Sequence, residues 1–451
     1  MASSHISSLK LRRLLVFVGV VTFFLLLHTF YNQRHNSFSF KDPVTYQDKE
    51  EAPEDYCVSL QELGNIFVII RTGFSEVHQK LQPLINTSLP CLPHYGIWSD
   101  LEETYAGQHI DNALDEIDPG LIASHSDFAY YRRLQEHGRD GFSAEELASW
   151  KQAPNTDRGR DTPGWKLDKW KFLPLAKKAY SQHPTSPWYM FIECDTFVFW
   201  ESLLEWLTNF DPTKPFYIGR QMHLGDKVFA YGGAGILISN PAMRMLVTQY
   251  TSNIERYNDL TINEWAGDYI LARVLSDAGI ELFYGWPTLE GDMPATLDFK
   301  STSPIGIYFW CYYTTTYHHL TPQDIYDYYE FEKTWKSNNR SLLSNGDIFR
   351  HLVFPRMKPE IPDWDNLSAD IEDGDFSFDE CLRKCESKPD CMQFSLSNRT
   401  CRTSKVVKLG NERLQERPSD ERVSSGWAIE RIEIFMGTME RSCVGRLWAL
   451  P

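Results

Sequence analysis

An apolar, aromatic stretch that ends in two acidic residues is the feature that most constrains the fold. Residues 188–192 have the length and composition of a strand buried on both faces, and Glu193 and Asp195 follow directly. Apolar residues then continue through 203–207, which predicts a helix. This order is typical of an open α/β sheet, in which ligands bind beyond the carboxyl ends of the strands. Carboxylates there can hold Mg or Mn against a substrate phosphate, and the alternative is a helix cap or a solvated turn.

Further strand and helix patterns extend this α/β arrangement along the chain. A continuous apolar run at residues 65–70 predicts a buried strand, a helical pattern covers 76–89, and 94–98 predicts a second strand. Strand, helix and strand in this order indicate parallel strands in one sheet. Residues 108–163 are charged and broken by proline and glycine, so we expect inserted helices and loops there. Another short strand is predicted at 216–219.

Three later segments carry residues that can bind a ligand. Gly232 and Gly233 precede an apolar run, and glycines allow the backbone to approach a ligand closely. Asp268 begins a predicted amphipathic helix, where its carboxylate suits either catalysis or a plain N-terminal cap. An aromatic segment ends in His318 and His319, and a histidine so far from the acidic turn is either a metal ligand or a structural residue.

The order of these segments resembles the Fringe-like glycosyltransferases of family 31, which include the core 1 β-1,3-galactosyltransferases, and particularly the fungal members. Glu193, Cys194 and Asp195 stand where that family has its Asp-x-Asp site. The resemblance implies a Rossmann-like α/β catalytic domain of the GT-A type over residues 60–335. It also implies Mn²⁺ as cofactor, a UDP-sugar as donor, and a glycan or glycoprotein as acceptor.

The resemblance assigns metal-binding and catalytic roles to individual residues. Asp195 and His318 would hold the metal, with His319 as the second choice for the histidine. Glu193 would bind the metal directly or through water, or orient the ribose of the donor. Asp268 would be the catalytic base that takes a proton from the acceptor hydroxyl.

The resemblance also implies a set of donor-binding residues: Arg71, Thr72, Lys169, Gly232 and Gly233. Arg71 and Thr72 follow the first predicted strand, where an ordinary turn with Thr72 as a helix cap is the alternative. Lys166 and Lys169 lie on one face of a predicted helix, where a solvated basic face is the alternative to binding a diphosphate.

The N-terminal segment predicts a membrane anchor. Residues 14–31 are apolar and follow several basic residues, so we expect a single-pass transmembrane helix with residues 1–13 in the cytosol. A cleaved signal peptide is the alternative, but no small-residue cleavage site follows the apolar segment. Residues 32–59 would form a luminal stem, which predicts a type II protein of the Golgi membrane or of the endoplasmic reticulum. Four sequons agree with glycosylation there: Asn86, Asn339, Asn366 and Asn398.

The C-terminal part is dense in cysteine. Residues 336–362 are rich in Asn, Ser and Pro and predict a linker, while 363–432 resemble a PAN or apple domain, a small disulfide-rich α+β fold. Zinc is the alternative to disulfides, and an oxidising compartment favours disulfides. Among three possible connectivities we prefer Cys381 with Cys401 and Cys385 with Cys391. Residues 433–451 remain unassigned.

Charge and cysteine count limit the remaining choices. The net charge is -16 and no basic cluster is present, which argues against nucleic acid as a partner. Nine cysteines leave at least one thiol unpaired or intermolecular. The resemblance to family 31 implies an inverting, metal-dependent transferase, with galactose in β-1,3 linkage. The alternatives are a Fringe-like N-acetylglucosaminyltransferase and an inactive, membrane-anchored binding protein.

Overall fold

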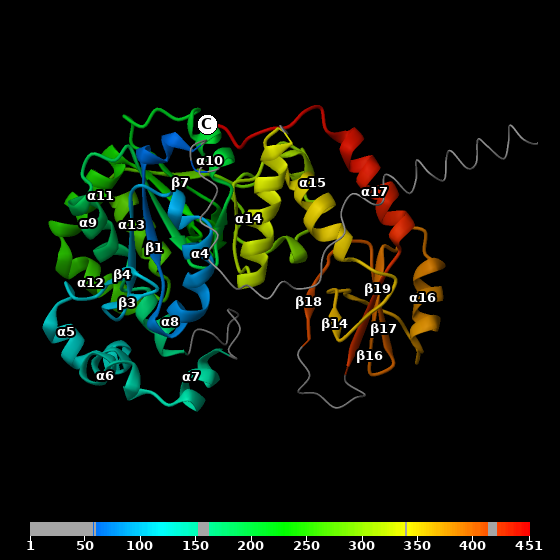
Figure 1. Cartoon of the computed structure of the whole chain (residues 1–451), viewed down its shortest axis with the longest axis horizontal. Helices are drawn as coiled ribbons and strands as arrows, with labels where there is room; N and C mark the ends of the chain where they lie inside the picture. Colours follow the sequence, from blue (N-terminus) through cyan, green and yellow to red (C-terminus); the bar gives the residue numbers. More distant parts are fainter. Residues whose placement is uncertain (1–56, 58–59, 152–161, 339–340, 414–421) are drawn as a thin grey trace, which may run out of the picture. The chain divides into compact units, whose positions relative to one another are not determined.

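The computed structural model of the chain describes residue 57 and residues 60–151, 162–338, 341–413 and 422–451. Its largest sheet has eight strands in the order β11-β7-β10-β5-β1-β2-β4-β3 (Figure 1). The strand bounds are β1 Ile66–Arg71, β2 Tyr95–Ser99, β3 Glu103–Tyr105, β4 Gln108–Asn112, β5 Trp188–Glu193, β7 Tyr217–Gly219, β10 Ile236–Ser239 and β11 Leu282–Tyr284.

The central strands of this sheet are parallel, as the sequence predicts. β1 pairs in parallel with β2 and with β5, so Arg71 at the end of β1 lies opposite Glu193 at the end of β5. β10 runs antiparallel between β5 and β7, which makes the sheet mixed. This arrangement fits a Rossmann-like domain. The region predicted as helices and loops from residue 108 begins instead with strand β4, which continues the sheet beside β2.

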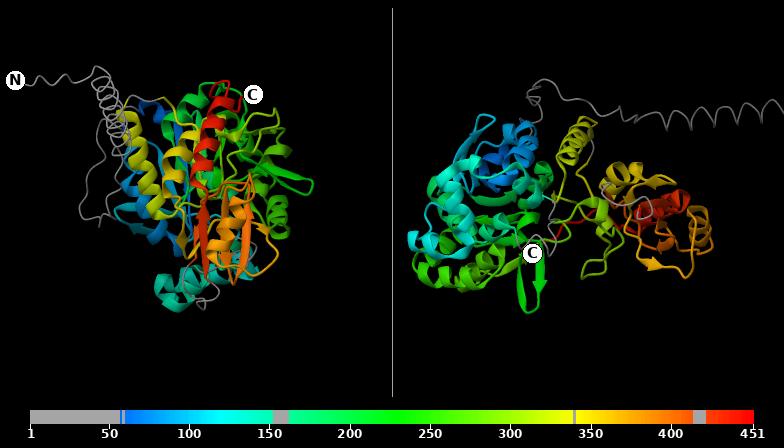
Figure 2. Two further views of the ribbon diagram at one scale, coloured as in Figure 1. Left: turned by 90° about the vertical axis from the view of Figure 1, so that its right-hand side faces the viewer. Right: turned by 90° about the horizontal axis from the view of Figure 1, so that it is seen from below.

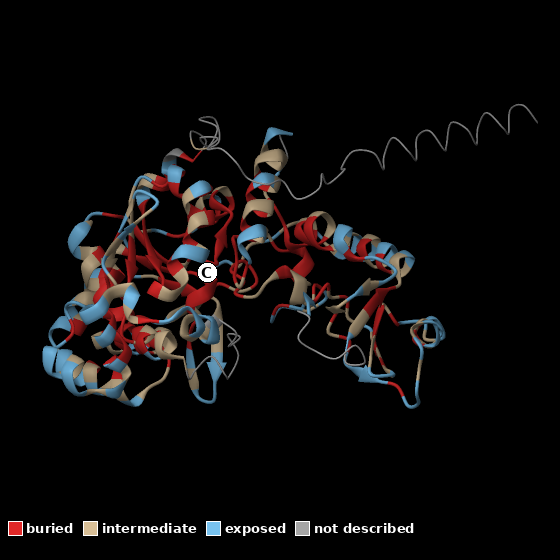
Figure 3. Ribbon diagram, turned by 60° about the horizontal axis from the view of Figure 1, so that its bottom comes forward, coloured by how far each residue is buried: buried red, intermediate tan, exposed pale blue. Residues whose placement is uncertain are grey.

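Alternate residues of β1 enter two different hydrophobic cores. Ile66, Val68 and Ile70 pack on one face of the sheet, and Phe67 and Ile69 pack on the other, as the two-residue period of a strand requires. The first face is covered by α4 Gln82–Asn86, α10 Trp200–Leu207 and α14 Pro322–Ser337, and the second by α9 Phe172–Gln182, α11 Asn240–Thr251 and α13 Gly267–Asp277. The centre of the sheet is consequently buried, shown in red in Figure 3.

Shorter elements surround this framework. They are α3 Phe74–Glu76, the π-helix η2 Val77–Leu81, α5 Pro119–Ser124, α6 Ala129–His137, α7 Ala144–Lys151, α8 Pro163–Asp168, the hairpin of β8 Gln221–Leu224 and β9 Lys227–Ala230, the 3-10 turn η7 Gly232–Ala234, and α12 Ile254–Asn263. A separate two-stranded sheet joins β6 Phe197–Val198 to β12 Thr316–Tyr317. Because β6 follows Asp195 and β12 precedes His318, this pairing brings these two residues together.

The C-terminal part forms a second, smaller sheet, coloured orange to red in Figure 2. Its five strands are β13 Ile361–Pro362, β19 Val423–Trp427, β16 Gln393–Ser397, β17 Thr400–Ser404 and β15 Asp370–Ile371, beside the pair β14 Trp364–Asp365 and β18 Asn411–Glu412. Helix α16 Phe378–Glu386 packs on this sheet. Disulfides join Cys381 to Cys401 and Cys385 to Cys391, which is the pairing preferred from the sequence.

Two C-terminal segments differ from their sequence predictions. Residues 336–362, which we expected to be a linker, contain α15 Asn345–Ile348 and η10 Phe349–Val353, whose apolar residues are buried. The unassigned residues 433–451 contain most of α17 Ile429–Ser442, and a disulfide joins Cys443 to Cys311. Apolar burial and a covalent bond therefore connect both segments to the rest of the chain.

The membrane prediction requires correction. The predicted cytosolic tail 1–13 and anchor 14–31 lie outside the described residues, as does nearly all of the predicted stem 32–59. In the described part of the chain, no helix has the length and apolar character needed to cross a membrane. The structure thus does not support a transmembrane helix as part of the fold. The single-pass type II location in the Golgi or endoplasmic reticulum, which rested on that helix, is withdrawn.

The four predicted glycosylation sites differ in accessibility. Asn86 and Asn398 are exposed, and Asn339 lies outside the described residues. Asn366 is fully buried, and its Nδ2 donates to two backbone carbonyl oxygens at 2.9 and 3.3 Å. A glycan has no room at this nitrogen in the folded chain, so the prediction at Asn366 is wrong.

Candidate functional site

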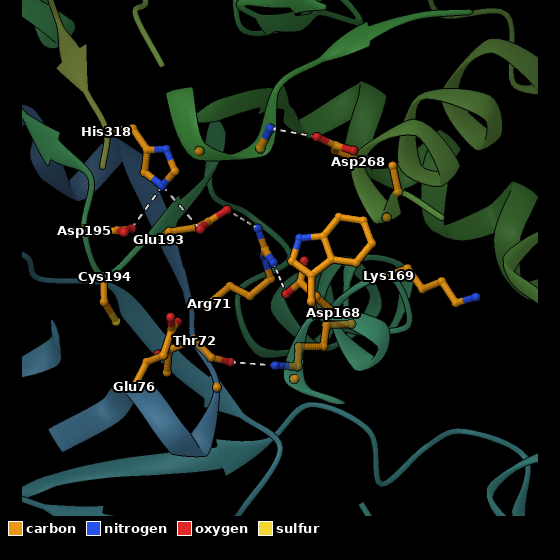
Figure 4. Close-up of a pocket in the computed structure, with 18 of the residues that line it drawn as sticks. Arg71, Thr72, Glu76, Asp168, Lys169, Glu193, Cys194, Asp195, Asp268 and His318 are labelled. Atoms are coloured by element: carbon orange, nitrogen blue, oxygen red, sulfur yellow. Dashed lines mark hydrogen bonds and ion pairs between the residues drawn. The ribbon is translucent and has the colours of Figure 1, made fainter. Parts of the chain in front are cut away.

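A cavity of about 740 Å³ is lined by residues that follow the carboxyl ends of β1 and β5. This is the edge of the sheet at which the sequence predicts a ligand site. The cavity wall includes every predicted metal, catalytic and donor-binding residue: Arg71, Thr72, Lys169, Glu193, Asp195, Gly232, Gly233, Asp268 and His318. In Figure 4, His318, Asp195 and Glu193 lie on one side, Asp268 lies on the other, and Arg71 lies between them.

Asp195 and His318 form the centre of the acidic side. Both side chains are buried, and His318 Nε2 lies 3.0 Å from Asp195 Oδ1 and 3.4 Å from Glu193 Oε2. Neither contact has hydrogen-bond geometry, and Nε2 has no hydrogen-bond partner among the described residues. Two carboxylate oxygens thus converge on one buried ring nitrogen, an arrangement that suits a metal ligand as well as the ion pair that a protonated His318 makes.

The group that can hold a metal consists of Asp195, His318 and His319, whose ligand atoms all lie within 4.8 Å of one another. One carboxylate and two imidazoles fit a divalent transition metal. Glu193 is not part of this group: its Oε1 is ion-paired with Arg71 at 2.5 Å, while its Oε2 lies 3.4 Å from His318 Nε2. A role of Glu193 at the metal therefore stays a prediction, and His319, the second choice for the histidine in the sequence analysis, joins the group.

The carboxylates in and beside this group are balanced by positive charges of the protein. Burial lowers the pKa of His318, but the carboxylates of Asp195 and Glu193 raise it more, to about 10. Burial raises the pKa of Asp195, but His318 and Lys80 bring it well below its ordinary value. A protonated imidazole thus balances the buried carboxylates, and a metal that binds Nε2 must displace that proton.

Lys80 is a site residue that the sequence analysis missed. Its Nζ lies 3.0 Å from Asp195 Oδ2 and 2.8 Å from Glu76 Oε1, and its side chain is 27% exposed along the cavity wall. Burial lowers the pKa of Lys80, but these two carboxylates raise it well above the ordinary value. A single lysine in a helical pattern gives no signal of such a role, because only the fold brings η2 beside the acidic turn.

Tyr231 was also missed. Its hydroxyl lies 3.2 Å from His318 Nδ1 and 3.0 Å from His319 Nε2, so one phenol contacts a nitrogen on each ring. Such contacts fix the ring orientation and the tautomer of metal-binding histidines. The signal in the sequence was its position directly before Gly232, at the start of the glycine turn.

The glycine turn connects the two sides of the cavity. Gly232 donates its backbone N–H to Asp268 Oδ2 at 3.0 Å. A Cβ atom on Gly233 would lie 2.3 Å from the ring of His318, closer than real side chains allow. The two glycines, predicted to contact the donor, therefore place the backbone against Asp268 and His318.

Asp268 stands in the first turn of α13, as predicted, and is half-buried. Its Oδ1 accepts the backbone N–H of Tyr269 at 2.9 Å, and its Oδ2 accepts that of Gly232. Burial raises the pKa of Asp268 to about 6, although both hydrogen bonds oppose the shift. A carboxylate held in this way is ionised near neutral pH and is still basic enough to accept a proton.

Arg71 and Lys169, both predicted to bind the donor, line the cavity with their charges paired to carboxylates. The guanidinium of Arg71 is buried, paired with both Asp168 and Glu193, and lies over the ring of Phe172 at 4.2 Å. Lys169 Nζ pairs with Asp127 at 2.9 Å, and Figure 4 shows its ammonium directed away from the acidic group. Arg71 therefore orients carboxylates of the cavity, and Lys169 stabilises the cavity wall.

Thr72 and Cys194 are two further residues of the cavity wall. Thr72 lies in the cavity wall, and its hydroxyl is buried beside Cys194. It does not cap a helix, since the N-cap of α3 is Gly73. Cys194 packs in the core, where burial raises its pKa to about 12. It is the one cysteine outside the four disulfides, the fourth being Cys57–Cys91.

Comparison with known proteins agrees with this geometry. A search of curated proteins found no match. A family model described as Fringe-like matches residues 171–283. The matched segment contains the acidic turn, the glycine turn and Asp268, while His318 lies beyond it. Residues 171–283 are thus similar to the Fringe-like family, which supports a glycosyltransferase of the Fringe and family 31 kind.

Proposed function

We propose that this chain is an inverting, metal-dependent glycosyltransferase that moves a sugar from a UDP-sugar to a hydroxyl of a glycan or glycoprotein. The observation that carries the proposal is the glycine turn between a cation-binding group and a basic aspartate. Gly233 packs on His318, and Gly232 donates to Asp268, so both chemical functions border one cavity.

The residues of the metal group would hold the diphosphate end of the donor. Asp195, His318 and His319 fit a divalent cation, and we propose Mn²⁺. Such a cation, when bound, stabilises the negative charge that develops on the UDP leaving group. Lys80 adds a positive charge on the same side of the cavity. Thr72 lines the cavity at the end of β1, where we propose that it contacts the donor.

Asp268 would accept the proton of the attacking hydroxyl. Two backbone N–H groups hold its carboxylate, so little reorientation is needed when the acceptor arrives. A base that deprotonates the acceptor while UDP leaves supports a single displacement, which inverts the anomeric centre. The resemblance to core 1 β-1,3-galactosyltransferases supports galactose as the sugar and β-1,3 as the linkage.

The C-terminal sheet forms part of the proposal as a separate module. We propose that residues 363–432 are a PAN or apple-like domain and that residues 60–335 are the catalytic domain. Helix α16, the five-stranded sheet and the two disulfides that join this helix to β17 and to the segment before β16 support the first assignment. The Fringe-like match and the cavity residues support the second.

UDP release tests the proposed function. The full chain is supplied with UDP-galactose, UDP-N-acetylglucosamine or UDP-glucose, with Mn²⁺ or with EDTA. We expect Mn²⁺-dependent release from UDP-galactose that is lost in Asp195→Ala and retained in Asp259→Ala, which removes an exposed carboxylate of α12. Preference for UDP-N-acetylglucosamine would overturn the choice of sugar. Equal release in EDTA, or none from any donor, would overturn the metal-dependent transferase.

A further inference from the structure

Residues 443–449, which we call the C-terminal segment, leave α17 and lie beside the chain that leads into β12. A disulfide joins Cys443 to Cys311. Leu447 donates its N–H to the carbonyl oxygen of Cys311 at 3.2 Å, and its own carbonyl oxygen accepts the N–H of Tyr313 at 2.9 Å. One covalent bond and two backbone hydrogen bonds therefore attach this segment to the residues that precede β12.

The far end of the C-terminal segment contacts the interior of the protein. The indole of Trp448 packs on the ring of Tyr313, with ring centroids 4.7 Å apart. Ala449 donates its N–H to the hydroxyl of Thr288 at 2.9 Å, and its carbonyl oxygen accepts the indole N–H of Trp206 in α10 at 2.7 Å. Figure 1 shows the segment in red, extending from α17 to α10. Since Thr288 and Trp206 are fully buried, the segment reaches the core of the protein.

Thr288 connects the C-terminal segment to the strand that precedes His318. Its carbonyl oxygen accepts the N–H of Thr315 at 2.9 Å and the hydroxyl of Thr315 at 3.0 Å. The next residue, Thr316, begins β12 and donates its hydroxyl to the carbonyl oxygen of Ala234 in the glycine turn at 2.8 Å. His318 follows β12 directly. The C-terminal segment is therefore connected to the metal group through one buried threonine.

Helix α17 fixes the start of the C-terminal segment. Arg431 in this helix donates to the carbonyl oxygens of Lys388 and Cys391, which follow α16, at 2.7 and 2.9 Å. Near the end of the helix, the Glu440 carboxylate accepts the indole N–H of Trp310 at 3.2 Å. Because both ends of the segment are held, its position relative to β12 is defined.

We propose that the C-terminal segment is a positioning element for His318, so that the metal site depends on residues outside the catalytic domain of residues 60–335. The segment contacts Thr288, and Thr288 holds the chain three residues before His318. Imidazoles that bind a metal lose affinity when the groups that orient them are lost. The proposal rests on the metal-dependent function and adds a distant part of the chain to its metal site.

Mn²⁺ binding to the full chain, measured by calorimetry, tests the positioning role without requiring turnover. Trp448→Ala removes the ring that packs on Tyr313, and Thr288→Val removes the hydroxyl that accepts the N–H of Ala449. We expect the Mn²⁺ dissociation constant to rise about tenfold in each variant and to return toward the wild-type value in Trp448→Phe and Thr288→Ser. The control is Trp335→Ala, which changes a half-buried tryptophan of α14 that packs on the same core as Trp448.

Hydrogen exchange of residues 311–320 in the metal-free chain provides a second measurement. These amides should exchange faster in Trp448→Ala than in Trp335→Ala, because the chain before His318 opens locally when the C-terminal segment is released. Equal Mn²⁺ affinity or equal exchange in the two variants would overturn the proposal, even if both variants melt at a lower temperature. If the wild-type protein bound no Mn²⁺, the metal-dependent function would be refuted, and hydrogen exchange would still decide whether the segment holds His318.

Discussion

Gly232 donates its backbone N–H to the carboxylate of Asp268 at 3.0 Å, and this bond ties the glycine turn to the first turn of α13. The next residue, Gly233, packs against His318 so closely that a side chain would overlap the imidazole ring. The Gly232–Gly233 peptide therefore sets the distance between Asp268 and His318. A substitution at Gly232 should affect the proposed base, and a substitution at Gly233 should affect metal binding.

Gly233→Ala should weaken metal binding. Its Cβ would lie 2.3 Å from the His318 ring, so the imidazole must move away from Asp195. We expect Mn²⁺ affinity to fall about 10- to 100-fold, the range seen when the support of a metal ligand is lost. Calorimetric titration of the full chain measures this, and Gly64→Ala, whose Cβ would meet nothing within 4 Å, is the control. Unaltered affinity in Gly233→Ala would show that His318 does not bind the metal.

Asp268→Asn should reduce turnover and leave donor binding intact. Asparagine keeps the shape and can still accept the N–H of Gly232, but it cannot take a proton. We expect kcat to fall about 10²- to 10⁴-fold, the usual contribution of a general base. UDP affinity in the presence of Mn²⁺ should stay within about twofold, because Asp268 lies outside the metal group. A normal kcat would exclude Asp268 as the base.

The activity should depend on pH through Asp268. Burial raises the pKa of this carboxyl to about 6 in the folded protein, so the ionised, basic form predominates only above that pH. We expect kcat/KM to rise with pH around 6, and to be roughly tenfold lower at pH 5 than on the plateau. The same shift means that ionisation of Asp268 lowers folding stability above about pH 6, and that this loss disappears as the pH falls. A profile that is flat from pH 5 to 8 would contradict the assignment.

Lys80→Met should strengthen metal binding in the absence of nucleotide. The Lys80 ammonium lies 3.0 Å from Asp195 Oδ2 and repels a divalent cation at the same carboxylate. We expect the Mn²⁺ dissociation constant to fall on the order of tenfold. UDP affinity should fall, because the diphosphate loses a positive charge on its side of the cavity. The matched control is Lys177→Met, an exposed lysine paired with Glu116. Weaker Mn²⁺ binding in Lys80→Met would contradict this account.

Asn366→Ala should destabilise the C-terminal sheet. The buried Nδ2 donates to the carbonyl oxygens of Phe394 and Gly426, which would lose that donor in the variant. We expect a loss of about 1–3 kcal/mol in unfolding free energy, as for other unsatisfied buried polar groups. Thermal unfolding measures this against Asn263→Ala, which removes an exposed helical hydrogen bond and should cost less than about 0.5 kcal/mol. Equal melting temperatures would show that this buried amide does not support the sheet.

Local sequence patterns predicted the framework of the site. The apolar runs of β1 and β5, the acidic turn, the glycine turn and the start of α13 were found because burial and helical spacing are visible over a few residues. The resemblance to the Fringe-like family then assigned Asp195, Asp268 and His318 to one site. All three line the cavity: Asp195 follows β5, the pairing of β6 with β12 brings His318 beside it, and the glycine turn holds Asp268.

Only the tertiary structure decided which oppositely charged residue each lysine of the cavity wall pairs with. Lys169, predicted to bind the donor, pairs with Asp127, and Lys80, which has no distinguishing pattern, pairs with Asp195. The burial of Asn366 likewise depends on strands distant in sequence. Side-chain pairing depends on which segments the fold brings within a few ångströms. The sequence by itself therefore determined the strands, the turns and the types of chemical group, and only the packing of those segments decided each partner.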